Sequence, residues 1–464
     1  MIFNSYQFMF FFPIFLILYY IIPKKIRLIY LLLASYYFYM ANTWQHAIIL
    51  IFTTIVSYTA GIILSRIDNQ RVKKSVLWGT VIVLVGVLGT YKFSQTSLPL
   101  GLSFFTFQAL GYVIDVYRNA ENKESDFFCY SLFVSFFPTV VSGPIERERT
   151  LIPQLKQCLI KQYSLKDIKE NFYYGITCFA QGFFLKMVIA DKAKVLVDQV
   201  FVNFELYGFG ELLIAAILFS IQLYCDFYGY SLIAMGAAKF IGVNLTDNFQ
   251  TPYFSRSVTE FWRRWHISLS AWFRDYIYIP LGGSRCSPLR CNVNKIITML
   301  ISGLWHGTGW NYIVWGGMHG CLMAFESSAQ MAHLNHGRTR LKDIIAYIRT
   351  LCAIVLLWIF FRADNLSHAL KYIFRMFTHW QMNENGLMGL GLESMQLLIL
   401  CVSLLILLVV SIMQYRNNMT LGDYLAIQPR WFSVFFLFLL LYFTLFFGEY
   451  GSGIQKAQFI YFQF

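Results

Sequence analysis

Long apolar runs constrain the fold of this chain more than any other feature. A helix of about 20 apolar residues spans the hydrocarbon core of a bilayer, and we count roughly eleven to thirteen such segments. Clear examples are "HAIILIFTTIVSYTAGIIL", "GELLIAAILFSIQLY", "LLILCVSLLILLVVSIM" and "WFSVFFLFLLLYFTLFF". Of the 464 residues 57% are hydrophobic and only 13% are charged, against about 25% charged in an average soluble domain. The sequence predicts an integral membrane protein.

We therefore expect an all-α fold, a single polytopic helical bundle over residues 1–464 with no separate soluble domain. The first apolar run has no basic segment ahead of it and no small-residue cleavage site behind it, which favours a retained span over a signal peptide. Basic residues follow the first and third apolar runs, so the positive-inside rule places the N-terminus outside. Pro138, Gly143 and Pro144 interrupt one run, which predicts a broken or re-entrant element there.

The net charge of +13 is carried in patches, and the densest of them is residues 256–295. This patch fits equally well an ordinary cytoplasmic loop and a mouth that attracts an anionic cytosolic ligand. Nucleic acid is not an expected partner, because Trp and Phe alternate with the basic residues. The nine cysteines are scattered singly, and Cys286 and Cys291 lack the C-x-x-C spacing of zinc or redox sites. Small apolar packing is their expected role.

The stretch "SVTEFWRRWHISLSAWFRDYIYIPLGG" within this patch is predicted to form an amphipathic helix in or at the membrane interface. Its large apolar residues recur every three or four positions, and the arginines fall largely away from that stripe. His266 lies on the apolar side. A lone histidine in such a place is more often a hydrogen-bonded packing residue than a catalytic one.

The stretch "GLWHGTGWNYIVWGGMHG" carries His306 and His319. One continuous helix would place them about 20 Å apart on opposite faces, but Gly307-Thr308-Gly309 can break it. Three glycines beside His319 let another helix, or a ligand, come close: Gly316, Gly317 and Gly320. A buried histidine stays neutral and suits general-base catalysis. Proton relay and structural hydrogen bonding remain alternatives, and no partner at i+3 or i+4 supports a metal site.

Asp226 is an acid inside the apolar run "SIQLYCDFYGYSLIAMG". An ionisable residue at membrane depth indicates a functional site with a partner. We expect that partner to be an arginine of the segment 256–274 or one of the histidines. A satisfied link between two helices explains the carboxylate equally well.

Together with "LLWIFFRA" and the terminal "FIYFQF", these motifs closely resemble the membrane-bound O-acyltransferases, in particular the bacterial branch that acts in alginate and peptidoglycan O-acetylation. The similarity runs from about residue 95 to the end, with the active-site motifs at about 222–320. It implies a transmembrane tunnel, with re-entrant or interfacial helices around it, in the bacterial cytoplasmic membrane. His319 matches the active-site histidine of this family, and His266 matches a second polar position, with His306 and Asp226 as supporting residues.

The resemblance also implies an acetyl donor, acetyl-CoA, that enters from the cytosol. The residues expected to bind it are Arg263, Arg264, Arg274, Trp262 and Trp265. The acceptor path opens on the outer face, where a periplasmic or extracellular SGNH-hydrolase-like O-acetyltransferase completes the transfer. No metal cofactor is implied, and membrane lipid surrounds the protein.

The aromatic tail at residues 458–464 resembles the end of a small partner protein in D-alanyl transfer. By that analogy Tyr461 relays the acetyl group as a phenolic ester; an interfacial aromatic anchor is the alternative. The expected function is O-acetylation of a cell-surface polysaccharide such as alginate, peptidoglycan or another exopolysaccharide. A transporter or flippase of a lipid-linked saccharide and a D-alanyl transfer protein are the competing functions.

Overall fold

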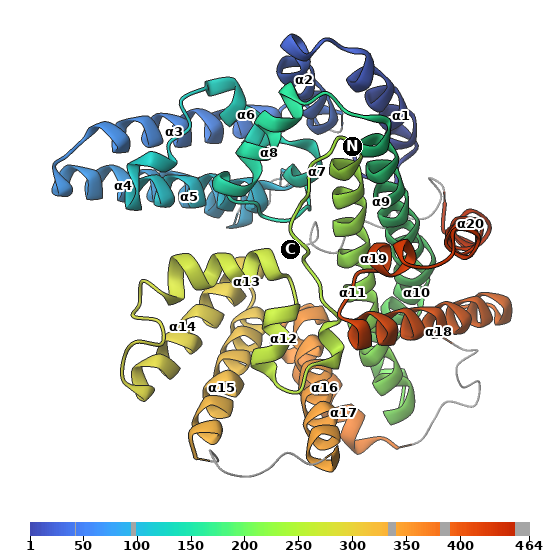
Figure 1. Cartoon of the computed structure of the whole chain (residues 1–464). Helices are drawn as coiled ribbons and strands as arrows, with labels where there is room; N and C mark the ends of the chain where they lie inside the picture. Colours follow the sequence, from blue (N-terminus) through green and yellow to red (C-terminus); the bar gives the residue numbers. More distant parts are fainter. Residues whose placement is uncertain (42, 94–98, 333–339, 381–389, 451–464) are drawn as a thin grey trace. The chain divides into compact units, whose positions relative to one another are not determined.

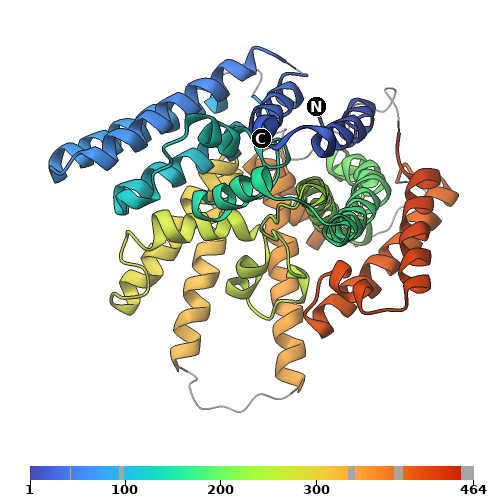
Figure 2. The same ribbon diagram turned by 45° about the horizontal axis from the view of Figure 1, so that its top comes forward.

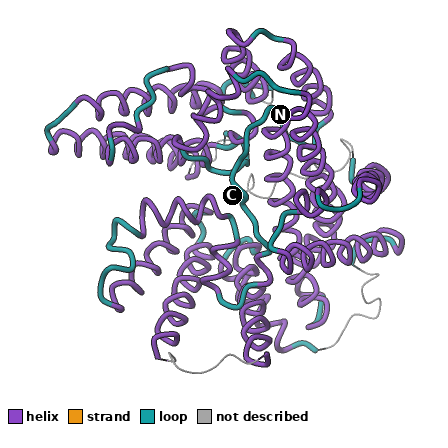
Figure 3. The backbone as a smooth tube through the Cα atoms, viewed as in Figure 1, coloured by secondary structure: helices purple, strands orange, loops and turns teal. Residues whose placement is uncertain are grey.

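The computed structural model describes residues 1–41, 43–93, 99–332, 340–380 and 390–450. Within this part of the chain Figure 3 shows helices joined by loops, and no strand. One isolated β-bridge, between Phe249 and Trp265, is the extent of the β-structure there. The expected all-α fold is confirmed.

The chain divides into two compact units, each assembled from two stretches of sequence. The first contains Met1–Phe179 and Tyr230–Asp247, and the second contains Ala180–Gly229 and Asn248–Phe464. Two long helices, α9 (Leu165–Phe183) and α11 (Phe209–Phe240), each contribute to both units. The second unit holds every candidate site residue that the structure describes.

The first unit contains the N-terminal helices, of which α3, α4 and α5 pack against one another (Figure 1). Its elements are α1 (Tyr6–Ile21), α2 (Arg27–Met40), α3 (His46–Arg66), α4 (Gln70–Phe93), α5 (Leu102–Arg118), α6 (Phe127–Ser135), α7 (Phe137–Val140), α8 (Glu148–Ile160) and most of α9 (Leu165–Phe183).

The interrupted apolar run of this unit forms two short helices, as its prolines and glycine predict. The nine residues of α6 extend only about 14 Å, against a hydrocarbon core of about 30 Å. Phe136, between α6 and α7, has an extended ψ of 114°, and Pro138 lies in the first turn of α7. The prediction of a broken element is confirmed.

The second unit contains the remaining helices, and its chain passes through a π-helical segment, Phe184–Ala190, before α10. Its elements are α10 (Asp191–Val202), the part of α11 (Phe209–Phe240) up to Gly229, α12 (Val258–Arg264), α13 (Ile267–Phe273), α14 (Pro288–His306), α15 (Trp310–Ala332), α16 (Arg340–Arg362), α17 (Leu366–Thr378), α18 (Ser394–Asn417), α19 (Leu421–Ala426) and α20 (Arg430–Phe447).

Seven helical stretches of the described chain are long and apolar enough to cross a membrane. They are α3, α4, the continuous stretch Leu165–Val202, α11, Leu341–Arg362 of α16, α18 and α20. The chain is therefore a multi-pass membrane protein. The number is below the eleven to thirteen spans expected, because several apolar runs are divided into short helices, and α1 has only 16 residues.

Candidate active site

The helical hairpin of α14 and α15 carries two of the candidate histidines. The chain leaves α14 at His306 and enters α15 at Trp310, so the predicted break at Gly307–Gly309 is present. The two helices lie side by side (Figure 1, Figure 2). A Cβ atom added to Gly316 would overlap the backbone carbonyl of Met299 on α14. The small residues next to His319 thus admit the neighbouring helix.

The hairpin brings His306 and His319 to the same side chain. The ring of Trp315 lies 5.0 Å, centroid to centroid, from the imidazole of His306 and 5.0 Å from that of His319. Both histidines are buried, with 3% and 0% of their surface exposed. His306 and His319 therefore belong to one aromatic cluster around Trp315, although they are separated in sequence.

The predicted amphipathic helix is wrong in one respect, because it is broken into α12 and α13 at Trp265 and His266. The backbone of His266 has a φ of +44°, in the left-handed region where a non-glycine residue is uncommon. The amide of Ile267 donates to the Asn248 carbonyl at 3.0 Å, and Trp265 forms the β-bridge. These hydrogen bonds to the preceding segment replace those that would continue a helix.

This turn places the imidazole of His266 inside the unit, away from solvent. None of its surface is exposed. Its ring packs edge-on against Phe227 of α11 at 4.5 Å and lies 6.5 Å from Trp305 of α14. Unfavourable backbone conformations persist where the surrounding structure enforces them, and they concentrate at functional sites.

Trp262 of α12 makes a direct contact with His319. Its indole Nε1–H donates to Nδ1 of His319 across 3.2 Å, and the two rings meet edge to face at 5.2 Å. No described group forms a hydrogen bond with the other nitrogen of His319, Nε2. Trp265 is also buried, between Phe261 and Trp358. The two tryptophans expected at the donor site thus belong to the aromatic cluster that surrounds His319.

Glu326 holds the N-terminal end of α12 against α15. Its carboxylate accepts hydrogen bonds from the amides of Val258 at 2.7 Å and Thr259 at 3.0 Å, and from the Thr259 hydroxyl at 2.9 Å. Glu326 follows His319 by two helical turns and therefore lies on the same face of α15. One face of α15 accordingly holds both the start of α12 and its Trp262. Nothing in the sequence points to Glu326 as a site residue, because an acid near a helix end does not reveal its partner.

The three arginines expected at the donor site differ in their surroundings. Arg264 forms an ion pair with Glu260 at 2.9 Å and lies over the ring of Tyr415 at 5.4 Å. Arg274 pairs with its neighbour Asp275, and 63% of its side chain is exposed. Arg263 is exposed. Two guanidinium groups thus face outward, and the third is engaged in packing.

We expected an arginine of residues 256–274 or a histidine as the partner of Asp226, whereas the ion pair found in the structure is formed with a lysine. Lys186, from the π-helical segment, lies 2.6 Å from Asp226 and 2.7 Å from Asp191. The three side chains are at most 6% exposed. The signal for Lys186 and Asp191 was present in the apolar run "FFLKMVIAD", where a lysine and an acid at membrane depth need each other.

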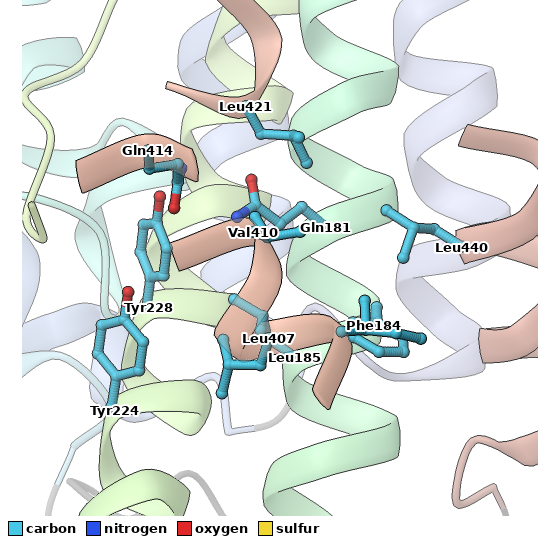
Figure 4. Close-up of a pocket in the computed structure, with 11 residues that line it drawn as sticks. Gln181, Phe184, Leu185, Tyr224, Tyr228, Leu407, Val410, Gln414, Leu421 and Leu440 are labelled. Atoms are coloured by element: carbon cyan, nitrogen blue, oxygen red, sulfur yellow. The ribbon is translucent and has the colours of Figure 1, made fainter. Parts of the chain in front are cut away.

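A pocket of the second unit lies between α11, α18 and the π-helical segment (Figure 4). Apolar side chains line it, together with Gln181, Gln414 and the phenols of Tyr224 and Tyr228. None of the three candidate histidines is among its lining residues.

In the described part of the chain no three His, Cys, Asp or Glu residues gather as metal ligands would. Tyr461 lies outside the described residues.

Comparison with known proteins relates this chain to membrane-bound acyltransferases. Residues 117–363 match the membrane-bound O-acyltransferase (MBOAT) family. The probable alginate O-acetylase AlgI of Pseudomonas aeruginosa is 34% identical, over 90% of this chain and 83% of that protein. The peptidoglycan O-acetyltransferase of Helicobacter pylori is 32% identical, over 74% and 72%. The teichoic acid D-alanyltransferase of Streptococcus thermophilus is 34% identical, over 52% and 59%.

Proposed function

The chain belongs to the membrane-bound O-acyltransferase family, and we propose that it moves acetyl groups from cytosolic acetyl-CoA across the bacterial cytoplasmic membrane for O-acetylation of a cell-surface polysaccharide. The observation that carries the proposal is His319, a fully buried imidazole inside the segment that matches the family. Its Nδ1 is held by Trp262, and its Nε2 is engaged by no described group. That nitrogen is the atom available to a substrate.

The relatives support a polysaccharide acceptor and an acetyl donor. Two of them, similar over most of their length, are named for O-acetylation of alginate and of peptidoglycan. The D-alanyltransferase is similar over only about half of this chain. A transporter of lipid-linked saccharides would show two related halves with paired interrupted helices. The sequence has no such pairing, and its polar motifs concentrate in residues 222–320.

We assign acetyl-CoA as the acyl donor because exposed positive charge lies near the aromatic cluster in sequence. Arg263 and Arg274 present exposed guanidinium groups, which suit the phosphates of coenzyme A. Arg264, the last residue of α12, stabilises this helix through its ion pair with Glu260. The acetyl thioester then extends towards His319, with His266 and His306 in the surrounding aromatic cluster. The positive-inside rule places the N-terminus outside and this basic segment at the cytosol.

Release to the outer face completes the scheme. A periplasmic or extracellular SGNH-hydrolase-like O-acetyltransferase takes the acetyl group and delivers it to the polysaccharide. Tyr461 is the proposed acetyl carrier between the two proteins. Peptide mapping after incubation with acetyl-CoA tests this step, since the relay requires an acetyl ester on Tyr461 and loss of transfer in Tyr461→Phe.

The central experiment uses the purified full-length protein in lipid nanodiscs with radiolabelled acetyl-CoA. His319→Ala should reduce acetyl transfer by about 10²- to 10⁴-fold and leave folding and donor binding intact. The matched control is His379→Ala, which removes an exposed imidazole and should retain full activity. A folded His319→Ala protein with normal transfer would exclude His319 as the catalytic residue. Transfer of D-alanine and not of acetyl would favour the competing acyl donor.

A further inference from the structure

The hydrogen bond between Trp262 and His319 determines which ring nitrogen of His319 carries a proton. The indole nitrogen of tryptophan is a donor only, so the Nδ1 atom that receives it at 3.2 Å must present a lone pair. The imidazolium carries protons on both nitrogens, and the Nδ1–H tautomer carries one on the wrong nitrogen. Both forms would direct two N–H groups at each other. The remaining form is the neutral ring with its proton on Nε2.

We propose that Trp262 is a positioning residue that fixes His319 as the Nε2–H tautomer, so that His319 acts on the donor thioester as an N–H hydrogen-bond donor and not as a general base. This inference rests on the proposed function, because it assigns the role of His319 within acetyl transfer. It replaces the general-base role expected from the sequence, which requires a lone pair on the nitrogen that faces the substrate.

The surroundings of Trp262 hold its N–H in place. Glu326 binds the N-terminal end of α12 through three hydrogen bonds, and Ser257 caps the helix by accepting from the Glu260 amide at 3.0 Å. The Trp262 ring also packs edge-on against Trp315 at 5.7 Å. Donors that are held before the reaction stabilise a developing charge without a cost of reorganisation.

The chemistry of a thioester suits such a donor. An acceptor hydroxyl attacks the thioester carbonyl, a C–O bond forms, and negative charge appears on the carbonyl oxygen. The Nε2–H of His319 donates a hydrogen bond to that oxygen. The C–S bond then breaks, and the proton of the acceptor hydroxyl passes directly from its oxygen to the departing thiolate, which yields the acetyl ester and coenzyme A. A thiolate is a good leaving group, as the pKa of about 8.5 of the cysteine thiol indicates. It therefore leaves without prior protonation by the enzyme, and the ring of His319 keeps its own proton throughout.

The tautomer can be read directly by nitrogen-15 NMR of the full-length protein in nanodiscs, with its eight histidines labelled. The His319 signals are assigned by their loss in His319→Gln. We expect an unprotonated, hydrogen-bonded Nδ1 and a protonated Nε2 at neutral pH. A protonated Nδ1 in the wild-type protein would overturn the inference while leaving His319 as the catalytic residue.

Trp262→Phe keeps an aromatic ring and removes the N–H donor. This variant should show His319 no longer held in one tautomer, with turnover reduced by about ten- to a hundredfold. Trp315→Phe is the matched control, since the Trp315 ring also contacts His319 but its N–H donates to no described group. His319 in that control should remain Nε2–H. Equal changes of the tautomer in both variants would reduce Trp262 to a packing residue.

Two isosteric variants of His319 separate the roles without touching Trp262. The amide nitrogen of Gln occupies roughly the place of Nε2–H, whereas that of Asn lies near Nδ1. If His319 is an N–H donor, His319→Gln should exceed both His319→Asn and His319→Ala in acetyl transfer by about tenfold or more. Equal inactivity of all three, with the wild type active, would restore the general base. Full activity of His319→Ala would instead contradict the proposed function itself.

Discussion

Lys186 and Asp226 form a buried ion pair, with 2.6 Å between the lysine Nζ and the carboxylate Oδ1. Asp191 approaches the same ammonium group at 2.7 Å. Charged groups removed from water are costly unless they are paired, and the cost rises at membrane depth. A single lysine therefore neutralises part of the charge of two carboxylates and links α11 to the π-helical segment before α10.

Replacement of Lys186 by Met should destabilise the protein severely. It leaves Asp191 and Asp226 without their cation, and breaking a buried pair costs about 3–5 kcal/mol. Size-exclusion chromatography and thermal unfolding in detergent should show low yield and a lower Tm. Lys166→Met is the control, because 86% of the Lys166 side chain is exposed and its loss should have no effect. If Lys186→Met unfolds at the wild-type temperature, the pair contributes nothing to stability.

The ion pair of Asp226 with Lys186 shows which features of the site can be predicted from the sequence and which cannot. An isolated acid in an apolar run correctly predicts a charged partner, but not which cation reaches it. We expected Arg263, Arg264 or Arg274 as this cation because they lie nearer in sequence to the candidate histidines than Lys186 does. The choice depends on the geometry of the π-helical segment, and no periodicity of apolar residues reports a local change from α- to π-helix.

The two helix breaks next to the candidate histidines also differ in how well the sequence predicts them. Glycines between His306 and His319 correctly predict the break of the helix, because glycine and threonine in series disfavour its continuation. The turn at His266 has no such signal: its sequence has helical periodicity on both sides, and hydrogen bonds with Asn248 override it. Tertiary contacts of this kind are absent from any local pattern.

The exposed arginines should act on donor binding, and Arg264 should act on stability. Arg263→Ala and Arg274→Ala are expected to raise the KM for acetyl-CoA on the order of tenfold at low ionic strength, with kcat unchanged, and to weaken its dependence on salt. Arg264→Ala removes the ion pair with Glu260 and should lower the Tm. Steady-state kinetics at several salt concentrations and thermal unfolding separate the two effects. Salt-independent loss of kcat in all three variants would exclude an electrostatic donor site.

Glu148 should make the stability of the protein depend on pH. Burial, followed by the nearby Asp115, raises the pKa of Glu148 from its ordinary value of 4.5 to about 7. Between these two values the folded state binds a proton that the unfolded state releases, so the stabilisation is complete below pH 4.5 and is lost as the pH rises to about 7. Gln resembles the protonated acid at every pH.

Glu148→Gln should therefore raise the Tm at pH 8 and leave it nearly unchanged at pH 5, as measured by thermal unfolding in detergent. The control is Glu170→Gln, because 62% of the Glu170 side chain is exposed. A Tm difference between Glu148→Gln and wild type that is the same at both pH values would show that Glu148 is ionised in the folded protein.

Glu326 and Trp262 should act together, because both attach α12 to the same face of α15. Glu326→Ala leaves the amides of Val258 and Thr259 without their acceptor, and each unsatisfied buried donor costs about 1–3 kcal/mol. We expect a lower Tm and reduced acetyl transfer, since the indole N–H is no longer held towards His319. Once α12 is loosened, loss of that N–H matters less. The double variant Glu326→Ala, Trp262→Phe should therefore lose less activity than the product of the two single effects. Strictly multiplicative losses would mean that Glu326 stabilises α12 without positioning Trp262.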